Sequence, residues 1–313
     1  WLDGRLRDRE SPYAALAERG GEDPALEAAA RRDIETFTLL AELDWDQVLA
    51  EVGGKAPREY GPVLANLPRW RGSSPFSFAE LTEFYRANGA GLFARHRAFL
   101  WEDGALCPVE QPDCPGADEM LGYELQRNRV IANTRAMLEG NLVNNVLLYG
   151  DSGTGKSATV KNLLTLPGFE ALRLIEVQKE GLADLPRLIR TLGGRRLKFI
   201  LFIDDLAFDQ DDQTYSSLKT ILEGGLERRP ANVAVYATSN RRRLVRQTFS
   251  DRAGDEVDAS ETIQEKTSLS DRFGLRIPYL ALNQAEFLEL VEGMAEQAGI
   301  ALDRDSLRAE AVK

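Results

Sequence analysis

A glycine-rich segment, Gly150–Ser157, reads Gly-Asp-Ser-Gly-Thr-Gly-Lys-Ser and directly follows the mostly apolar run Asn145–Tyr149. When the pattern G-x-x-x-x-G-K-S joins a strand to a helix, it forms a loop whose backbone N–H groups point inward at a chain of phosphates. The glycines permit a close approach of the backbone that a side chain would block. The helix expected from Lys156 to about Leu164 adds partial positive charge at the same place. The segment therefore predicts a phosphate-binding loop.

Two side chains of this segment have expected roles of their own. Lys156 is expected to reach the β- and γ-phosphates, and the hydroxyl of Ser157 to ligate Mg²⁺. The residues predicted to surround the phosphates are Gly150, Asp151, Ser152, Gly153, Thr154, Gly155, Lys156 and Ser157. The segment thus predicts a nucleoside triphosphate and Mg²⁺ as ligands.

A second apolar run, Phe199–Ile203, ends in two acids, Asp204 and Asp205. An acid at the end of a strand is what the metal side of such a site requires, so we expect Asp204 to hold Mg²⁺ opposite Ser157, directly or through water. Asp205 is expected to face the γ-phosphate and to polarise an attacking water. The alternative is that both aspartates only cap the loop that follows, which is itself acidic.

Two later residues complete the candidate catalytic set. Asn240 follows the run Val233–Ala237, and its amide can orient the attacking water without competing for the metal, although such residues also occur in strand-end turns. Arg272 stands just before the run Leu275–Pro278. Its guanidinium can reach the γ-phosphate bound to a neighbouring subunit, or it can form an ion pair with Asp271 that only shapes the turn.

Short apolar runs alternate with helical patterns from about Asp118 onward. The runs are continuous, which is typical of parallel strands covered on both faces. They are Val146–Tyr149, Leu172–Val177, Phe199–Ile203, Val233–Ala237 and Leu275–Pro278, and the helical patterns between them are Lys156–Leu164, Leu182–Leu192 and Tyr215–Leu226. This alternation predicts an α/β domain, residues 119–282, whose ligand lies at the carboxyl ends of the strands.

Residues 1–118 are predicted to form a separate, mostly helical N-terminal domain. Apolar residues recur at helical spacing in residues 25–52 and again from about Phe78 to Trp101, where Ser77 is the expected N-cap. The single histidine, His96, is then expected on a helix surface. The stretch Cys107–Gly116 contains three prolines and is interpreted as the linker to the next domain.

The net charge of −11 argues against a surface that grips nucleic acid as a whole. A local basic cluster, Arg241–Arg243 with Arg246, can bind a nucleic-acid backbone or an acidic partner, or pair with the acidic stretch Asp255–Glu265. The overall charge favours pairing within or between subunits.

No stretch approaches 18 uninterrupted apolar residues, so no membrane span is expected. Two cysteines, Cys107 and Cys114, are too few for a disulfide scaffold or for the usual cysteine-based zinc site, and we expect free thiols in a cytoplasmic protein. Because the chain starts at Trp1 and stops inside a helical pattern, we interpret it as part of a longer protein.

Taken in order, these motifs resemble those of the AAA+ ATPase superfamily: Gly150–Ser157 as Walker A, Phe199–Asp205 as Walker B, Thr238–Asn240 as sensor 1 and Ser270–Gly274 as the arginine-finger region. More closely, the chain resembles a bacterial AAA+ family described only as predicted ATPases of unknown function. That resemblance rests on Asn144–Gly150, Phe202–Leu206, Leu222–Leu226, Ala237–Arg241 and Leu269–Gly274.

The resemblance implies a P-loop core with five parallel strands in the order 5-1-4-3-2, a helical N-terminal part, and a small helical lid that begins with residues 283–313. It implies ATP and Mg²⁺ as ligands, with Leu121, Gly122 and Tyr123 near the adenine. It also implies a homo-oligomer, either a ring or a transient assembly.

Two departures from the family pattern matter. Most AAA+ proteins have Glu as the second Walker B acid, whereas this chain has Asp205, whose carboxylate is set back by about one methylene, so the attacking water must be placed differently or turnover is slow. The sensor 2 arginine of the lid cannot be matched to Arg304 or to Arg308.

Three functions remain open on these grounds. The first is Mg²⁺-dependent ATP hydrolysis coupled to remodelling of an unknown protein or nucleic-acid partner. The second is a nucleotide-dependent conformational switch with slow or no hydrolysis. The third, a small-molecule or nucleoside kinase, is disfavoured because it needs neither an amide sensor nor an arginine from a neighbouring subunit.

Overall fold

The computed structural model describes residues 7, 10–55, 57–66, 77–116, 119–207, 218–219, 221–222, 229–240, 269–300 and 303–311. The basic cluster and the acidic stretch named above lie outside these residues, as does most of the predicted helix Tyr215–Leu226. The chain separates into two compact units, Trp1–Arg95 and His96–Lys313, so the boundary predicted at residue 118 falls inside the second unit. No helix in the described part is long and apolar enough to cross a membrane.

The described residues of the first unit form helices. Its helices are α2 (Pro12–Glu18), α3 (Pro24–Glu42), α4 (Trp45–Lys55), α5 (Gly61–Ala65), α6 (Phe78–Asn88) and α7 (Leu92–Arg95), with a short 3₁₀ turn at Arg58–Tyr60. Ser77 caps α6 by accepting from the Glu80 N–H at 3.2 Å, which confirms the predicted N-cap. A small core joins α2, α3 and α6; its buried members are Tyr13, Ala14, Ala17, Ile34, Leu81, Tyr85 and Ala90.

The prediction of a helix that continues from Phe78 to Trp101 is wrong. Helix α6 ends at Asn88 and is capped by Gly89, whose φ of 83° is unfavourable for other residues, and strand β1 (Ala98–Glu102) follows α7. His96 therefore lies in the turn between α7 and β1, with its ring edge-on to Phe99. The apolar residues of this stretch are buried by strand pairing, which their helical spacing did not reveal.

Among the described residues, the second unit is built on one sheet of seven strands, not five. The strands are β1, β2 (Ala105–Val109), β3 (Val146–Gly150), β4 (Leu172–Val177), β5 (Lys198–Ile203), β6 (Val233–Ser239) and β7 (Leu275–Tyr279). Their order is β2-β1-β4-β5-β6-β3-β7, and all neighbours are parallel except β2, which is antiparallel to β1. The complete order therefore differs from the prediction, because a hairpin extends the sheet beyond β4. The five expected strands still follow one another as β7-β3-β6-β5-β4, which is 5-1-4-3-2 when they are numbered alone.

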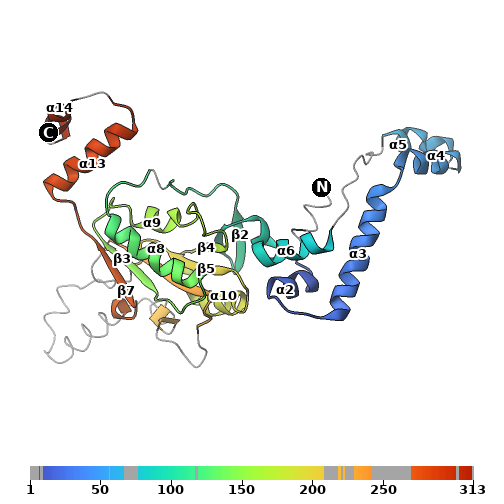
Figure 1. Ribbon diagram of the computed structural model, residues 1–313, viewed down its shortest axis with the longest axis horizontal. Coiled ribbons are helices and arrows are strands. Elements are labelled where there is room, and N and C mark those ends of the chain that lie inside the picture. The colour runs from blue at the N-terminus through green and yellow to red at the C-terminus, as the bar shows by residue number, and fades with distance from the viewer. Residues whose placement is uncertain are drawn as a thin grey trace. The chain divides into compact units, whose positions relative to one another are not determined.

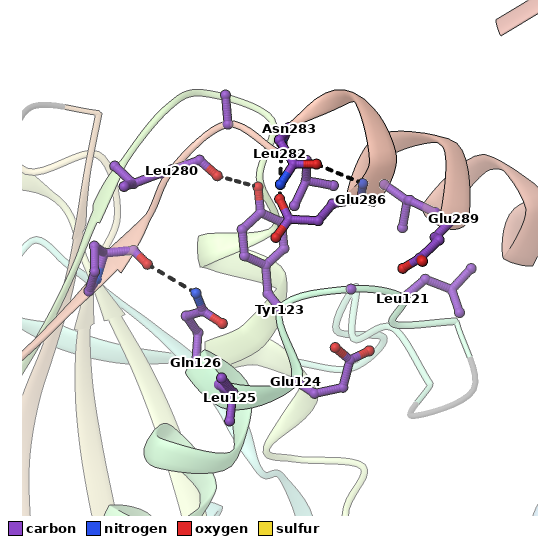
Figure 2. A pocket seen from close by; sticks show the side chains of 14 residues that line it. Leu121, Tyr123, Glu124, Leu125, Gln126, Leu280, Leu282, Asn283, Glu286 and Glu289 are labelled. Atoms are coloured by element: carbon purple, nitrogen blue, oxygen red, sulfur yellow. Dashed lines mark hydrogen bonds between the residues drawn. The ribbon is translucent and has the colours of Figure 1, made fainter.

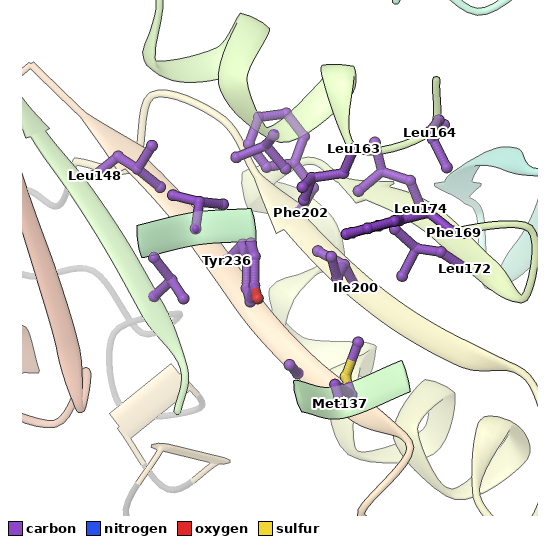
Figure 3. Close-up of a cluster of buried hydrophobic side chains, with 14 of the residues drawn as sticks. Met137, Leu148, Leu163, Leu164, Phe169, Leu172, Leu174, Ile200, Phe202 and Tyr236 are labelled. Atoms are coloured by element: carbon purple, nitrogen blue, oxygen red, sulfur yellow. The ribbon is translucent and has the colours of Figure 1, made fainter. Parts of the chain in front are cut away.

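The helices of this unit are α8 (Glu124–Leu138), α9 (Lys156–Asn162), α10 (Leu185–Leu192), α13 (Gln284–Gln297) and α14 (Arg304–Ala311), and a 3₁₀ segment, Lys179–Asp184, precedes α10. Figure 3 shows the core on one face of the sheet, where Tyr236 lies among side chains such as Leu148 and Phe202. Alternate residues such as Leu147 and Leu201 are also fully buried. Burial on both faces explains why the strands are continuous apolar runs.

The stretch Cys107–Gly116 is not a linker between the two units. It begins inside β2, and Cys114 packs against the core of the second unit. The Asn162 amide donates to the Pro115 carbonyl oxygen at 2.7 Å, which ties the stretch to α9. Both cysteines are free thiols, as predicted. The two outer strands each contain a proline, Pro108 in β2 and Pro278 in β7, a residue that cannot donate a backbone hydrogen bond to a further strand.

Candidate nucleotide-binding site

The glycine-rich loop, residues 150–157, connects the end of β3 to the start of α9, as predicted. Gly150 lies against β7: a Cβ atom there would be 1.9 Å from the carbonyl oxygen of Tyr279, so only glycine fits. Gly153 and Gly155 have φ values of 75° and 80°, in the left-handed region that favours glycine. These three glycines therefore allow the backbone of the loop to adopt this conformation.

Lys156 is buried within this loop, with 6% of its surface exposed. Its ammonium donates to the carbonyl oxygens of Asp151 at 2.6 Å and of Gly150 at 3.3 Å, so it points into the loop. Burial lowers the pKa of Lys156, while the carboxylates of Asp151, Asp205 and Asp204 oppose that shift. A phosphate chain at this place would supply a stronger acceptor for the same ammonium.

The two predicted metal ligands lie together. The Ser157 hydroxyl donates to Asp204 Oδ1 at 2.5 Å, which joins the start of α9 to the end of β5 across the intervening strand β6. Among the residues that the structure describes, no three His, Cys, Asp or Glu side chains gather closely enough to hold a metal ion by themselves. One hydroxyl and one carboxylate suit Mg²⁺, which keeps several waters and takes further oxygen ligands from phosphates.

Asp205 and Asn240 are also brought together. The Asn240 amide donates to Asp205 Oδ1 at 2.9 Å, although the residues lie at the ends of different strands. Asp205 has a φ of 48°, in the left-handed region, where Asp and Asn are enriched among residues other than glycine. A single pocket is lined by Ser152, Gly153, Thr154, Gly155, Lys156, Ser157, Ala158, Asp204, Asp205, Thr238 and Asn240.

A second pocket, of about 620 Å³, is lined by the other predicted nucleotide-binding residues, Leu121, Gly122 and Tyr123. The remaining lining comes from the start of α8, the end of β7 and α13: Glu124, Leu125, Gln126, Pro278, Leu280, Ala281, Leu282, Asn283, Glu286, Glu289 and Leu290. The pocket thus lies where three elements of the second unit meet.

Tyr123 is held rigidly at this pocket. Its hydroxyl donates to the Leu280 carbonyl oxygen at 2.7 Å, as Figure 2 shows, and its ring stacks on Tyr279 with 5.0 Å between the centroids. The Tyr279 hydroxyl is 2.9 Å from Thr159 Oγ1 on α9. Burial raises the pKa of Tyr279 to about 12, so both its ring and its hydroxyl act as neutral packing groups.

The side chain of Asp151 joins the glycine-rich loop to Ala281, a residue that lines the Tyr123 pocket, which the sequence did not indicate. Its Oδ2 accepts from the Ala281 N–H at 2.6 Å, and its own N–H donates to the Tyr279 carbonyl oxygen at 2.9 Å. No local motif marks Ala281 or the residues around it. Only the pairing of β3 with β7 brings residue 281 next to the glycine-rich loop.

The structure does not bring the remaining predicted residues into either pocket. Arg272 is exposed and lies outside the residues that line them, and Asp271 forms its ion pair with Arg276. On α14, the Nε atoms of Arg304 and Arg308 contact the Glu292 carboxylate of α13 at 3.6 and 2.5 Å. Neither α14 arginine lines the pockets, and their contacts tie α14 to α13.

Residues 94–313 match the model of a family described as "Protein of unknown function (DUF815)". No curated protein matches the chain.

Similar solved structures include the Thermotoga maritima RuvB Holliday junction branch migration motor, at 17% identity with a TM-score of 0.40, covering 64% of this chain and 58% of that one. Two RuvB variants from the same organism have 16% identity and TM-scores of 0.41 and 0.40, and each covers 64% of this chain. These matches cover 58% and 60% of the variants' own chains, so this chain spans about three fifths of the structures that it matches. The family model takes in the glycine-rich loop, both aspartates and Arg272, and the chain therefore belongs to the family described as "Protein of unknown function (DUF815)".

Proposed function

We propose that this protein is an AAA+ ATPase that binds Mg·ATP at the glycine-rich loop and hydrolyses it. The observation that carries the proposal is the contact between the Ser157 hydroxyl and Asp204. Two oxygen ligands suited to Mg²⁺ meet beside a loop whose backbone and buried lysine suit phosphates.

Each residue of the site has its own role in the proposed reaction. Lys156 and the loop N–H groups bind the β- and γ-phosphates, and Ser157 with Asp204 holds Mg²⁺, which neutralises charge on the phosphates. Asp205 polarises the attacking water, and the contact from Asn240 fixes the direction of its carboxylate. The Asp205 carboxylate is set back by about one methylene relative to Glu, so the attacking water is placed differently or turnover is slow.

The pocket around Tyr123 takes the adenine. It has the volume of a small-molecule site and apolar walls from Leu121, Leu280 and Leu290. The contact from Asp151 to Ala281 places it beside the loop that holds the phosphates. One nucleotide can then occupy both pockets.

A nucleotide-dependent switch with slow or no hydrolysis is the second candidate. The observation that favours it is the hydrogen bond from Asn240 to Asp205, which occupies one carboxylate oxygen of the group that would activate water. In this candidate, Mg·ATP binds as above and sets the conformation without rapid turnover.

Assembly and partners follow from the AAA+ assignment. Arg272, which is exposed and outside both pockets, acts on the γ-phosphate bound to a neighbouring subunit of a ring or transient homo-oligomer. The partner that is remodelled is a protein or a nucleic acid, α13 and α14 form the start of the lid, and the protein acts in the cytoplasm.

The test is binding of a fluorescent ATP analogue with and without Mg²⁺, followed by ATP turnover at increasing protein concentration. Lys156→Ala should abolish binding, whereas Lys161→Ala, on the last turn of the same helix, should bind like the wild type. Micromolar binding by the Lys156 variant would remove the assignment. Specific activity that rises with concentration supports sites completed between subunits, and a flat, very low rate favours the switch.

A further inference from the structure

The hydroxyl of Thr238 lies between the two aspartates of the candidate site. Thr238 is the next-to-last residue of β6 and is 2% exposed. Strand β6 runs parallel to β5 with Ala237 opposite Ile203, so Thr238 comes level with Asp204. Its Oγ1 lies 2.5 Å from Asp204 Oδ1 and 2.9 Å from the Asp205 backbone nitrogen.

The chemistry of the three groups fixes the direction of both hydrogen bonds. An ionised carboxylate can only accept, and a backbone N–H can only donate. The single proton of the Thr238 hydroxyl therefore goes to Asp204, and its lone pair accepts from the Asp205 N–H. A buried hydrogen bond to a charged acceptor is stronger than one between neutral groups, so Asp204 is the favoured partner of the hydroxyl proton.

The first bond orients Asp204. Its Oδ1 also accepts from the Ser157 hydroxyl at 2.5 Å and lies 3.2 Å from the Asp205 N–H. Ser157 belongs to the set that would bind Mg²⁺, so its hydroxyl has to turn towards the ion. Thr238 has no such second task, and its bond keeps Asp204 in place when Ser157 turns.

The second bond holds the backbone at Asp205. The φ of 48° at this residue is uncommon for residues with a side chain. The bond to Thr238 Oγ1 restrains that turn, and the Leu206 N–H donates to the Thr238 carbonyl oxygen at 2.7 Å. The turn thereby directs the Asp205 carboxylate towards Asn240, and the carboxylate accepts a hydrogen bond from the Asn240 amide.

We propose that Thr238 is a positioning residue whose hydroxyl sets the direction of both Asp204 and Asp205. This inference rests on the proposed function and deepens it, because it assigns the geometry of the metal ligand and of the water-activating acid to one group on the neighbouring strand. Thr238 acts only through these two residues.

The test compares Thr238→Val, which keeps the shape and removes the hydroxyl, with Thr238→Ser, which keeps the hydroxyl. Steady-state ATP turnover is measured against Mg²⁺ concentration, and nucleotide binding and thermal unfolding are measured in parallel. The valine variant should lower kcat and raise the Mg²⁺ requirement, each by about 10- to 100-fold, as expected when a partner of a metal ligand is lost. Its KM for ATP should change little, and the serine variant should behave like the wild type.

Equal turnover and equal Mg²⁺ dependence in the valine variant and the wild type would overturn the inference. A serine variant as impaired as the valine variant would do the same, because the hydroxyl would then not be the active group. Should the valine variant unfold, Thr238→Cys, which is similar in size and a much weaker donor, carries the same expectation.

The failure of this inference can be told from failure of the proposed function. If the wild type binds no Mg·ATP, the proposed function fails and this inference fails with it. If the wild type hydrolyses ATP, Lys156→Ala does not, and Thr238→Val is unimpaired, only the role of Thr238 is lost. If the wild type binds ATP without turnover, Thr238→Val should raise the Mg²⁺ concentration required for binding, and an unchanged requirement would overturn the inference.

Discussion

The Asp151 carboxylate accepts a hydrogen bond from the Ala281 N–H at 2.6 Å, so the glycine-rich loop is joined directly to the segment that leads into α13. The Asp151 carbonyl oxygen also accepts from the Lys156 ammonium and from the Thr154 hydroxyl. A ligand that moves Lys156 therefore acts on a residue whose side chain holds the start of α13.

Asp151→Ala should free the Ala281 amide. We expect its hydrogen exchange to accelerate by about 10-fold or more, because a hydrogen bond to a charged acceptor is lost. Asp151→Asn is the matched control, since the amide oxygen can still accept from the same N–H. Unchanged exchange at Ala281 in the alanine variant would show that the contact does not restrain the segment. Exchange is measured by mass spectrometry with and without Mg·ATP.

Gly150→Ala should destabilise the second unit by about 3 kcal/mol, because the new Cβ atom would overlap the Tyr279 carbonyl oxygen of β7. Gly153→Ala is the control in the same loop: it has a φ of 75° but no atom within 4 Å of the added Cβ. That variant should lose only about 1 kcal/mol through backbone strain. The free energy of unfolding in urea distinguishes them, and equal losses would contradict the close approach of β3 and β7.

Asp205→Asn should bind Mg·ATP and lower turnover by about 10²- to 10⁴-fold, as expected when a general base is removed. Asn tolerates the left-handed backbone at this position, so the loss can be assigned to the carboxylate. Asp205→Glu should also lower turnover, because Glu is less suited to that backbone and its longer side chain displaces the contact with Asn240. Turnover by the glutamate variant above that of the wild type would contradict this.

The lowered pKa of Lys156 predicts a pH dependence of stability. The unfolded chain holds the lysine proton up to a higher pH than the folded chain does, so stability rises with pH between the folded and the unfolded pKa. Lys156→Met removes the buried charge and should unfold at higher urea than the wild type near neutral pH. The difference should shrink as pH rises through the folded pKa towards 10.5, the ordinary lysine value. A difference that is constant with pH would show that burial of the charge is not its cause.

Arg272→Ala should lower ATP turnover on the order of 10³-fold if its guanidinium completes a neighbouring site. Mixing this variant with Lys156→Ala should restore part of the activity, because each supplies what the other lacks. Arg276→Ala is the control, since Arg276 is exposed nearby and pairs with Asp271. Mixtures that never regain activity would remove the support for shared sites.

The glycine-rich loop and the two aspartates could be predicted because their information is local. A strand that runs into a fixed spacing of glycines, or into an acid, is visible within a few residues of Gly150 and of Asp204. Their meeting could also be expected, since the carboxyl ends of parallel strands lie at one edge of the sheet.

Features that depend on strand pairing could not be predicted in the same way. The run Ala98–Glu102 follows a helical pattern, and it becomes a strand because it pairs with β4 more than 70 residues later in the chain. Likewise, the contacts of Asp151 with Ala281 and of Thr238 with both aspartates require that β7 lies beside β3 and β6 beside β5. None of these pairs of neighbouring strands can be predicted from the local spacing of residues.

Proline in the last strand limits how copies of this protein can join. The Leu275 N–H of β7 donates to Asn145 beside β3, so by alternation residue 278 faces the opposite, outer edge of the sheet. Pro278 has no N–H to offer there, and its carbonyl oxygen already accepts from Gln126 of α8 at 3.4 Å. A further strand that paired along this edge would find no backbone donor at residue 278, so a backbone ladder shared between two copies could not continue past it.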